Sequence, residues 1–282
     1  MVTSINDTVK LNNGVEMPQH GFGVYLITDQ NQARAAIDKA LDSGYRAFDT
    51  AEFYKNEALL GKLLRESGFQ RSDLFITTKI ANSLQGYDST LKAIDQSLRD
   101  LQIEQIEQID LLLIHWPSKK HFFETWKAFE KLYDEKLVRA IGVSNFEIHH
   151  LERLATKANV KPAVNQMEIH PYFTQATLRN YLKKQDIAAE AWSPLGRGAV
   201  LGDETIGKIA EKYGQSPAQV IIRWHLQSGT IVIPKSQTPK RIAQNANVYG
   251  FSLTDDEMRM IDALDRKDGR NGPVPDEKYE EI

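Results

Sequence analysis

Four residues with reactive side chains follow short apolar runs in the first half of the chain. Asp49 and Tyr54 come after the run at 47–48, Lys79 ends the run FITTK, and His115 follows the run IDLLLI. If these runs are neighbouring parallel strands, the four side chains meet at one rim of a barrel, because polar residues at the C-terminal ends of barrel strands face the same mouth. An acid, a phenol, an amine and an imidazole in one pocket predict a proton-transfer site.

Tyr54 is the expected general acid of this site. A tyrosine with an ordinary pKa of about 10 is a poor proton donor near neutral pH. We expect the ammonium group of Lys79 to lower that pKa, and Asp49 to pair with Lys79 and keep it charged. His115 is expected to donate a hydrogen bond that orients a substrate carbonyl group.

The elements that must position these residues alternate along the chain. Apolar runs and stretches with helical periodicity, including a helix over 30–43, make eight strand–helix units without a linker or a change of composition. This pattern predicts an α/β fold, a (β/α)8 TIM barrel that forms one domain over residues 1–282. Asn13 and Gly14, between two short extended pieces, predict an N-terminal β-hairpin. A direct repeat at 103–108 (IEQIEQ) is expected in a loop at the bottom of the barrel.

The composition excludes several classes of partner and chemistry. The net charge of -3 offers no basic excess for a phosphate backbone, so we expect no nucleic-acid partner. The absence of cysteine excludes disulfides, thiolate nucleophiles and Cys-ligated zinc. No uncharged run approaches the length of a membrane span, and the N-terminus does not read as a signal peptide. We therefore expect no membrane association, a cytoplasmic location and a monomer.

Several segments together resemble the signature segments of the aldo-keto reductase family, in the family's order and over nearly the whole chain. They are GYRAFDTAEFY at 44–54, TTK at 77–79, LLLIHWP at 111–117, AIGVSNF at 140–146, VNQMEIHP at 164–171, AWSPLG at 191–196 and IPKS at 233–236. The resemblance implies an enzyme that uses NADPH to reduce aldehydes and ketones to alcohols. It suggests as substrates small dicarbonyls or keto-sugar acids, such as methylglyoxal and 2,5-diketogluconate, or a prostaglandin endoperoxide.

The cofactor site is not of the Rossmann type. The segment GFGVYL begins like the GxGxxG fingerprint but has Leu26 in place of the last glycine. Two cations and a hydroxyl cluster after the last strand instead, at Lys235, Ser236 and Arg241. Such a set can hold the adenosine 2'-phosphate that distinguishes NADP from NAD.

The resemblance assigns further cofactor contacts. It implies that Ser144, Asn145 and Gln166 bind the nicotinamide carboxamide and that Trp192 stacks on the nicotinamide ring. The remaining contacts, to the pyrophosphate, the adenine and nearby atoms, are assigned to Gly23, Val24, Ser193, Leu195, Gly196, Thr238, Gln244 and Asn245. Family members often have a glutamate at the position of Gln244.

Aromatic residues are expected to form the substrate walls, namely Tyr25, Phe53 and Trp116, beside His115. Family members often carry a tryptophan two residues after the lysine, where this chain has Ala81, so the pocket is expected to be wide. The loop at 117–123 and the polar tail after residue 270 are both short. We therefore expect neither to form a deep apolar lid.

Three alternatives to this mechanism can be formulated. Asp49, His115, Glu168 and His170 could be ligands of a divalent metal in an isomerase or hydrolase, although this would leave the cluster of cations unexplained. We therefore predict no metal. Lys79 could form a Schiff base, as in barrel aldolases. The barrel could also bind NADPH as a sensor without turnover.

Overall fold

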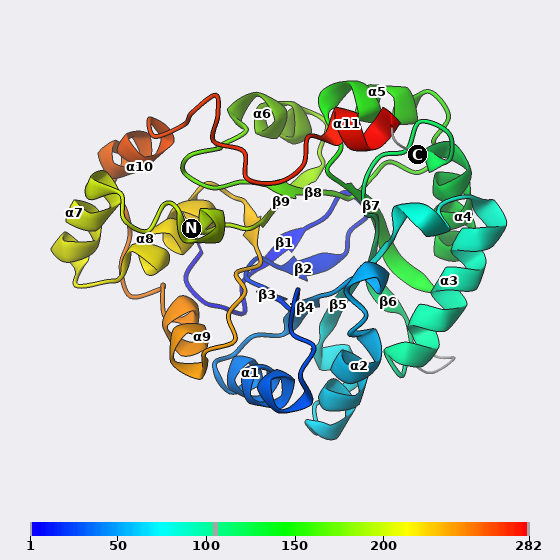
Figure 1. Ribbon diagram of the computed structural model, residues 1–282, viewed down its shortest axis with the longest axis horizontal. Coiled ribbons are helices and arrows are strands. Elements are labelled where there is room, and N and C mark those ends of the chain that lie inside the picture. Colours follow the sequence, from blue (N-terminus) through cyan, green and yellow to red (C-terminus); the bar gives the residue numbers. More distant parts are fainter. Residues whose placement is uncertain (1, 104–106, 281–282) are drawn as a thin grey trace.

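The computed structural model describes residues 2–103 and 107–280. Eight parallel strands form one sheet in sequence order, and a ring of helices surrounds them (Figure 1). The strands are β3 (Phe22–Gly23), β4 (Ala47–Asp49), β5 (Phe75–Ile80), β6 (Ile109–Ile114), β7 (Val138–Ser144), β8 (Val164–Glu168), β9 (Ala188–Trp192) and β10 (Ile231–Val232). The predicted (β/α)8 barrel is thus confirmed. Residues 104–106 of the predicted repeat lie outside the described range.

The barrel closes between its first and last strands. His20 forms a parallel bridge with Val232, and the backbone N–H of Gly21 donates to the carbonyl oxygen of Val232 at 2.9 Å. Closure joins the two edges of the sheet and aims the C-terminal ends of all strands at one mouth.

Most helices of the ring follow the strands one by one. They are α1 (Gln30–Asp42), α2 (Glu57–Glu66), α3 (Tyr87–Asp100), α4 (Phe122–Asp134), α5 (Ile148–Ala155), α6 (Ala176–Lys184), α7 (Glu204–Tyr213), α8 (Pro217–Gln227) and α9 (Pro239–Ala246). Each packs an apolar stripe inward; on α2, for example, Leu60, Leu63 and Leu64 are buried. Burial of such a side chain stabilises the fold by roughly 1.5–3 kcal/mol. No helix in the described ranges is both long and apolar enough to cross a membrane.

The N-terminal hairpin closes the bottom of the barrel. Strands β1 (Thr8–Lys10) and β2 (Glu16–Pro18) pair antiparallel, with Val9 opposite Met17. Gly14 has a φ of 88°, in the left-handed region that the turn requires. The side-chain amide of Asn13 donates to the carbonyl oxygen of Arg139 at 3.0 Å, near the start of β7. The hairpin predicted from Asn13 and Gly14 is therefore present, at the end opposite the mouth.

Two further helices follow the barrel at the C-terminus, α10 (Asp255–Asp262) and α11 (Pro275–Glu280). The segment between them, red in Figure 1, runs past α6 and brings α11 next to α5. This tail lies far from the barrel's last strand in sequence, yet it contributes to the pocket described below.

Candidate active site

The four reactive residues predicted from the sequence lie together at the mouth of the barrel. Asp49 is the last residue of β4, and Tyr54 is the last residue of the short 3-10 helix Glu52–Tyr54 that follows β4. Lys79 is next to last in β5, and His115 directly follows β6. Because these strands are neighbours in the sheet, their ends converge. Lys79 is 1% exposed, and its Nζ donates to Asp49 Oδ1 at 2.6 Å and to the carbonyl oxygen of Thr50 at 2.8 Å.

Tyr54 packs directly over this buried ion pair. The Nζ of Lys79 lies 5.1 Å from the centroid of the Tyr54 ring. The rings of Tyr54 and His115 meet edge to face with their centroids 5.7 Å apart, and the centroid of the Tyr25 ring lies 4.8 Å from that of Tyr54. The phenol, the ammonium and the imidazole thus share one small volume.

The pKa of Tyr54 does not follow the prediction. Burial raises the pKa of Tyr54 above its ordinary value, and the charge of Lys79, which acts to lower it, compensates only in part. The prediction of a net lowering was wrong because the sequence shows the nearby cation but not the desolvation of the phenol. Burial acts to lower the pKa of Lys79, but the charges of Asp49 and Tyr54 outweigh it and raise this pKa, so Lys79 stays charged.

His115 is neutral in this environment. Burial, aided by the charge of Lys79, lowers the pKa of His115 to about 3. A neutral imidazole can still donate one N–H hydrogen bond to a carbonyl group. The role predicted for His115 therefore needs no protonated ring.

A buried amide lies beneath the four residues. The Nε2 of Gln166 donates to Asp49 Oδ2 at 2.7 Å and to Glu190 Oε2 at 2.9 Å. Both hydrogens of this amide are thereby used, so only its carbonyl oxygen can still bind a ligand. Burial and the charge of Asp49 raise the pKa of Glu190 to about 8.

A second polar chain crosses the mouth from β6 to β9. The Nδ2 of Asn145 donates to the carbonyl oxygen of His115 and to Ser144 Oγ, both at 3.0 Å. The indole N–H of Trp192 donates to Asn145 Oδ1 at 2.8 Å. Asn145 therefore links the predicted proton-transfer residues to the aromatic ring at the end of β9.

A large pocket of about 1280 Å³ extends from these residues across the mouth. It is larger than the roughly 300–1,000 Å³ of a typical small-molecule site. Its lining includes Tyr54 and His115 as well as the cations Lys235 and Arg241. Neither of these cations forms an ion pair with a residue in the described part of the chain. Burial lowers the pKa of Lys235.

Most of the residues assigned to the cofactor from the sequence border this pocket. They are Gly23, Ser144, Asn145, Gln166, Trp192, Ser193, Leu195, Lys235, Ser236, Arg241, Gln244 and Asn245. Val24, Gly196 and Thr238 do not border it. Val24 and Gly196 are buried, and Thr238 precedes the first residue of α9.

The residues expected to form the substrate walls also border the pocket: Tyr25, Phe53, His115 and Trp116. Tyr25 is 47% and Phe53 61% exposed, so both stand at the rim rather than in the barrel core. Ala81, at the position where a tryptophan is often found, lies in the pocket wall. Its methyl group leaves this side of the pocket open.

The C-terminal tail is tied to the mouth through Glu168. The backbone N–H groups of Asn271 and Gly272 donate to the two carboxylate oxygens of Glu168, both at 2.8 Å, and His170 Nε2 lies 3.1 Å from Glu168 Oε1. A Cβ atom on Gly272 would lie 2.4 Å from the indole of Trp192, so only glycine fits. Glu168 and His170 are thus tail anchors here, in contrast to the metal-ligand alternative.

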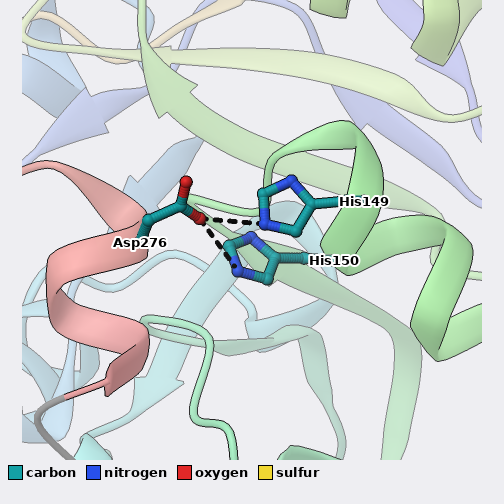
Figure 2. A group of neighbouring side chains, drawn as sticks. All are labelled: His149, His150 and Asp276. Atoms are coloured by element: carbon teal, nitrogen blue, oxygen red, sulfur yellow. Dashed lines mark ion pairs between the residues drawn. The ribbon is translucent and has the colours of Figure 1, made fainter.

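A second contact holds α11 against α5 (Figure 2). Within residues 2–103 and 107–280, His149, His150 and Asp276 are the one group of three whose ligand atoms could surround a metal ion. Asp276 Oδ1 lies 2.9 Å from His149 Nε2 and 3.4 Å from His150 Nε2. The Nδ1 of His150 accepts the backbone N–H of Glu147, which places the proton of the neutral ring on Nε2, facing Asp276. Through Asp276, these three side chains connect α11 of the tail to α5.

Several lining residues were missed by the sequence analysis. They are Leu26, Asn82, Ser83, Arg197, Gly198, Leu201, Ser216, Pro217, Ala218, Pro273 and Lys278. For Ser216 and Pro217 a signal existed, since Ser-Pro marks a helix start and such starts attract anions. Glu190 was also missed, although a carboxylate inside a buried strand is itself a signal of function. For the tail residues Pro273 and Lys278, no local sequence pattern indicates that they line the pocket.

Comparison with known proteins places the chain in a family. A model described as "Aldo/keto reductase family" matches residues 21–266. Glyoxal reductase of Bacillus subtilis is 51% identical over 277 residues, which cover 98% of this chain and 99% of the relative. A 9,11-endoperoxide prostaglandin H2 reductase of Trypanosoma cruzi is 50% identical and covers 95% of this chain and 94% of its own.

A solved structure supports the same assignment. The crystal structure of a Gox0644 mutant in complex with NADPH has a TM-score of 0.91 and 48% sequence identity, with coverage of 96% of this chain and 98% of the other. The barrel, its mouth and these likenesses over nearly the full length agree. The chain belongs to the aldo/keto reductase family.

Proposed function

We propose that the protein is an NADPH-dependent reductase of aldehydes and ketones, with Tyr54 as the general acid. The observation that carries the proposal is a buried, charged lysine under the ring of Tyr54, at a pocket whose lining also includes Lys235 and Arg241, which form no ion pair among the described residues. The first feature serves proton transfer, and the second serves an anionic cofactor.

The described residues fit NADPH. Lys235, Ser236 and Arg241 would hold the 2'-phosphate, since charged donors bind phosphate oxygens strongly. The carbonyl oxygen of Gln166, whose N–H groups are both engaged, would accept a hydrogen bond from the carboxamide. Trp192 would stack on the ring. When bound, NADPH supplies the hydride.

The protein's own residues would carry the proton and orient the substrate. The neutral His115 donates a hydrogen bond to the substrate carbonyl oxygen. Tyr54 transfers its phenolic proton to that oxygen as negative charge develops on it. Lys79 stabilises the phenolate that remains, and Asp49 keeps Lys79 charged and in place. The raised pKa of Tyr54 means that the phenol holds its proton until this step.

Small dicarbonyls are the substrates that the pocket supports best. The wall at Ala81 is open, and the aromatic residues Tyr25 and Phe53 are exposed at the rim, so the site offers little enclosure to a large apolar ligand. The names of the relatives, a glyoxal reductase and methylglyoxal reductases, point the same way, while the trypanosomal relative keeps a prostaglandin endoperoxide as a further candidate.

A Schiff-base mechanism at Lys79 has less support. A nucleophilic lysine must lose its proton, but the pKa of Lys79 is raised and its Nζ is engaged by Asp49 and the carbonyl oxygen of Thr50. Borohydride in the presence of a carbonyl substrate should therefore give no covalent adduct.

The test of the proposal is Tyr54→Phe, which removes only the phenolic hydroxyl. We expect NADPH to bind with nearly unchanged affinity and methylglyoxal reduction to fall by roughly 10² to 10⁴, the range of general acid catalysis. Phe53→Leu, at the exposed neighbouring position, is the matched control and should keep the chemical step. If Tyr54→Phe turned over at the parental rate, Tyr54 would not be the acid; if the parent bound NADPH without reducing any of a panel of carbonyls, the sensor alternative would hold.

A further inference from the structure

Glu190 is a fully buried carboxyl group one layer below the mouth of the barrel. It lies on β9 two residues before Trp192, so both side chains point to the same face of the strand. In the sheet it lies directly beside Gln166 on β8. Its Oε2 accepts one hydrogen of the Gln166 amide, and Asp49 Oδ2 accepts the other.

The surroundings of Glu190 are dry and poor in partners. A narrow space beside it, bordered by Asp49, Thr77 and the apolar residues Ile231 and Ile233, has no room for a water molecule. The Oε1 atom has no hydrogen-bond partner in the described part of the protein. Ionising a carboxylate that has only one hydrogen-bond donor in such a place is costly.

The buried positive and negative charges beneath the pocket cancel when Glu190 is neutral. Lys79 is paired with Asp49, and the imidazole of His115 is neutral. An ionised Glu190 would add one uncompensated negative charge to this group. The pKa of about 8 for Glu190, caused by burial and the charge of Asp49, agrees with this balance. At neutral pH Glu190 therefore carries a proton.

We propose that Glu190 positions the nicotinamide by orienting Gln166. We further propose that ionisation of Glu190 sets the relative affinity of the protein for the oxidised and the reduced cofactor. The inference rests on the proposed function, in which Gln166 and Trp192 hold the nicotinamide. The oxidised ring carries a positive charge that the reduced ring lacks. Ionisation of Glu190 therefore favours NADP+ over NADPH, and binding of NADP+ favours release of the proton from Glu190.

Three other titratable groups near Glu190 have shifted pKa values that lie outside the range between pH 7 and pH 9. The pKa values of Tyr54 and Lys79 are raised above their ordinary values of 10 and 10.5, and that of His115 is about 3. The 2'-phosphate is common to both cofactors and cancels from their ratio. A change in the affinity ratio between pH 7 and pH 9 would therefore report on Glu190.

The test is calorimetric titration of NADP+ and NADPH into the protein at pH 7 and pH 9, for the parent, Glu190→Gln and Glu190→Ala. For the parent we expect the preference for NADP+ over NADPH to rise about fivefold. One charge roughly 10 Å from a cation at an effective dielectric constant near 20 changes the affinity by about tenfold, and part of this effect is already present at pH 7 because the pKa of Glu190 is about 8. Glu190→Gln, the neutral isostere, should bind both cofactors with a ratio independent of pH. Glu190→Ala should weaken both by about 3- to 10-fold, because Gln166 loses one acceptor.

Glu57→Gln is the matched control. Glu57 is also buried with a pKa raised by burial, but it accepts from Thr78 and Ser97 and does not border the pocket. It should keep the parental pH dependence. A parental ratio that is the same at both pH values, or a Glu190→Gln variant that keeps the parental change, would overturn the inference. Failure of the parent to bind either cofactor would instead overturn the proposed function.

Discussion

Replacement of Lys79 by methionine should separate the structural and chemical roles of the buried ion pair. The change removes the cation but keeps an unbranched apolar stem in a site that is 1% exposed. Asp49 Oδ1 then loses its 2.6 Å partner and stays buried beside Glu190. Breaking a buried pair in this way typically costs about 3–5 kcal/mol, because one charge is left uncompensated. We expect a loss of this size in the free energy of unfolding, measured by urea titration.

Turnover should fall for a different reason. The charge of Lys79 is the main influence that lowers the pKa of Tyr54 against the effect of burial. Without it, the phenolate left after proton transfer is no longer stabilised, so we expect carbonyl reduction to fall by about 10² to 10⁴, followed by the loss of NADPH absorbance. NADPH binding should persist, because Lys79 does not border the pocket.

Two comparisons make this prediction sharp. Lys55→Met removes an exposed lysine paired with Glu52 in the same segment, and should change stability by less than about 1 kcal/mol. The double change Lys79→Met with Asp49→Asn removes both charges, so it should recover most of the stability but none of the turnover. Turnover within tenfold of the parent for Lys79→Met, or recovery of turnover in the double variant, would show that the charge of Lys79 does not support proton transfer.

Three further predictions concern the cofactor, the histidine and the tail. Arg241→Ala should raise the dissociation constant of NADPH by roughly one to two decades, because charged hydrogen bonds to phosphate contribute about 1.5–3 kcal/mol. The dissociation constant of NADH should stay unchanged. If the ratio of the two constants did not change, the 2'-phosphate would bind elsewhere. His115 has a pKa of about 3, below its unfolded value of 6.5, so its contribution to stability is present above pH 6.5 and is lost as the pH falls, by up to about 1.4 kcal/mol per pH unit. The urea midpoint of the parent should drop more between pH 6.5 and pH 4 than that of His115→Gln, and equal drops would contradict the neutral imidazole. Gly272→Ala should displace the indole of Trp192 and change protein fluorescence and substrate KM, whereas Gly250→Ala, where a Cβ meets no atom within 4 Å, should change neither.

Much of the site could be predicted from the sequence because its residues stand at fixed places in a repeating pattern. Asp49, Lys79 and His115 each come at or just after the end of an apolar run, and the run itself is set by local periodicity. Once the runs are parallel strands in sequence order, their ends must meet at the mouth. The Asp49–Lys79 pair then follows from neighbouring strands of one sheet.

Other properties depend on contacts between distant segments. The raised pKa of Tyr54 results from the burial of its phenol, which no spacing of residues expresses. The positions of Val24, Gly196 and Thr238 away from the pocket likewise depend on where each chain segment turns after its strand. The tail was described from its composition as short and polar, but its backbone amides find Glu168 and its Gly272 packs on Trp192.

The order of strands and helices, the closed barrel and the residue types at its mouth can thus be predicted from the chain alone, because periodicity and strand ends are local properties. The desolvation of each group, the pairing of amides with carboxylates and the covering of the mouth arise only in the folded protein. These depend on long-range packing, in which groups more than a hundred residues apart, such as Gln166 and Asp49, come within 2.7 Å of each other.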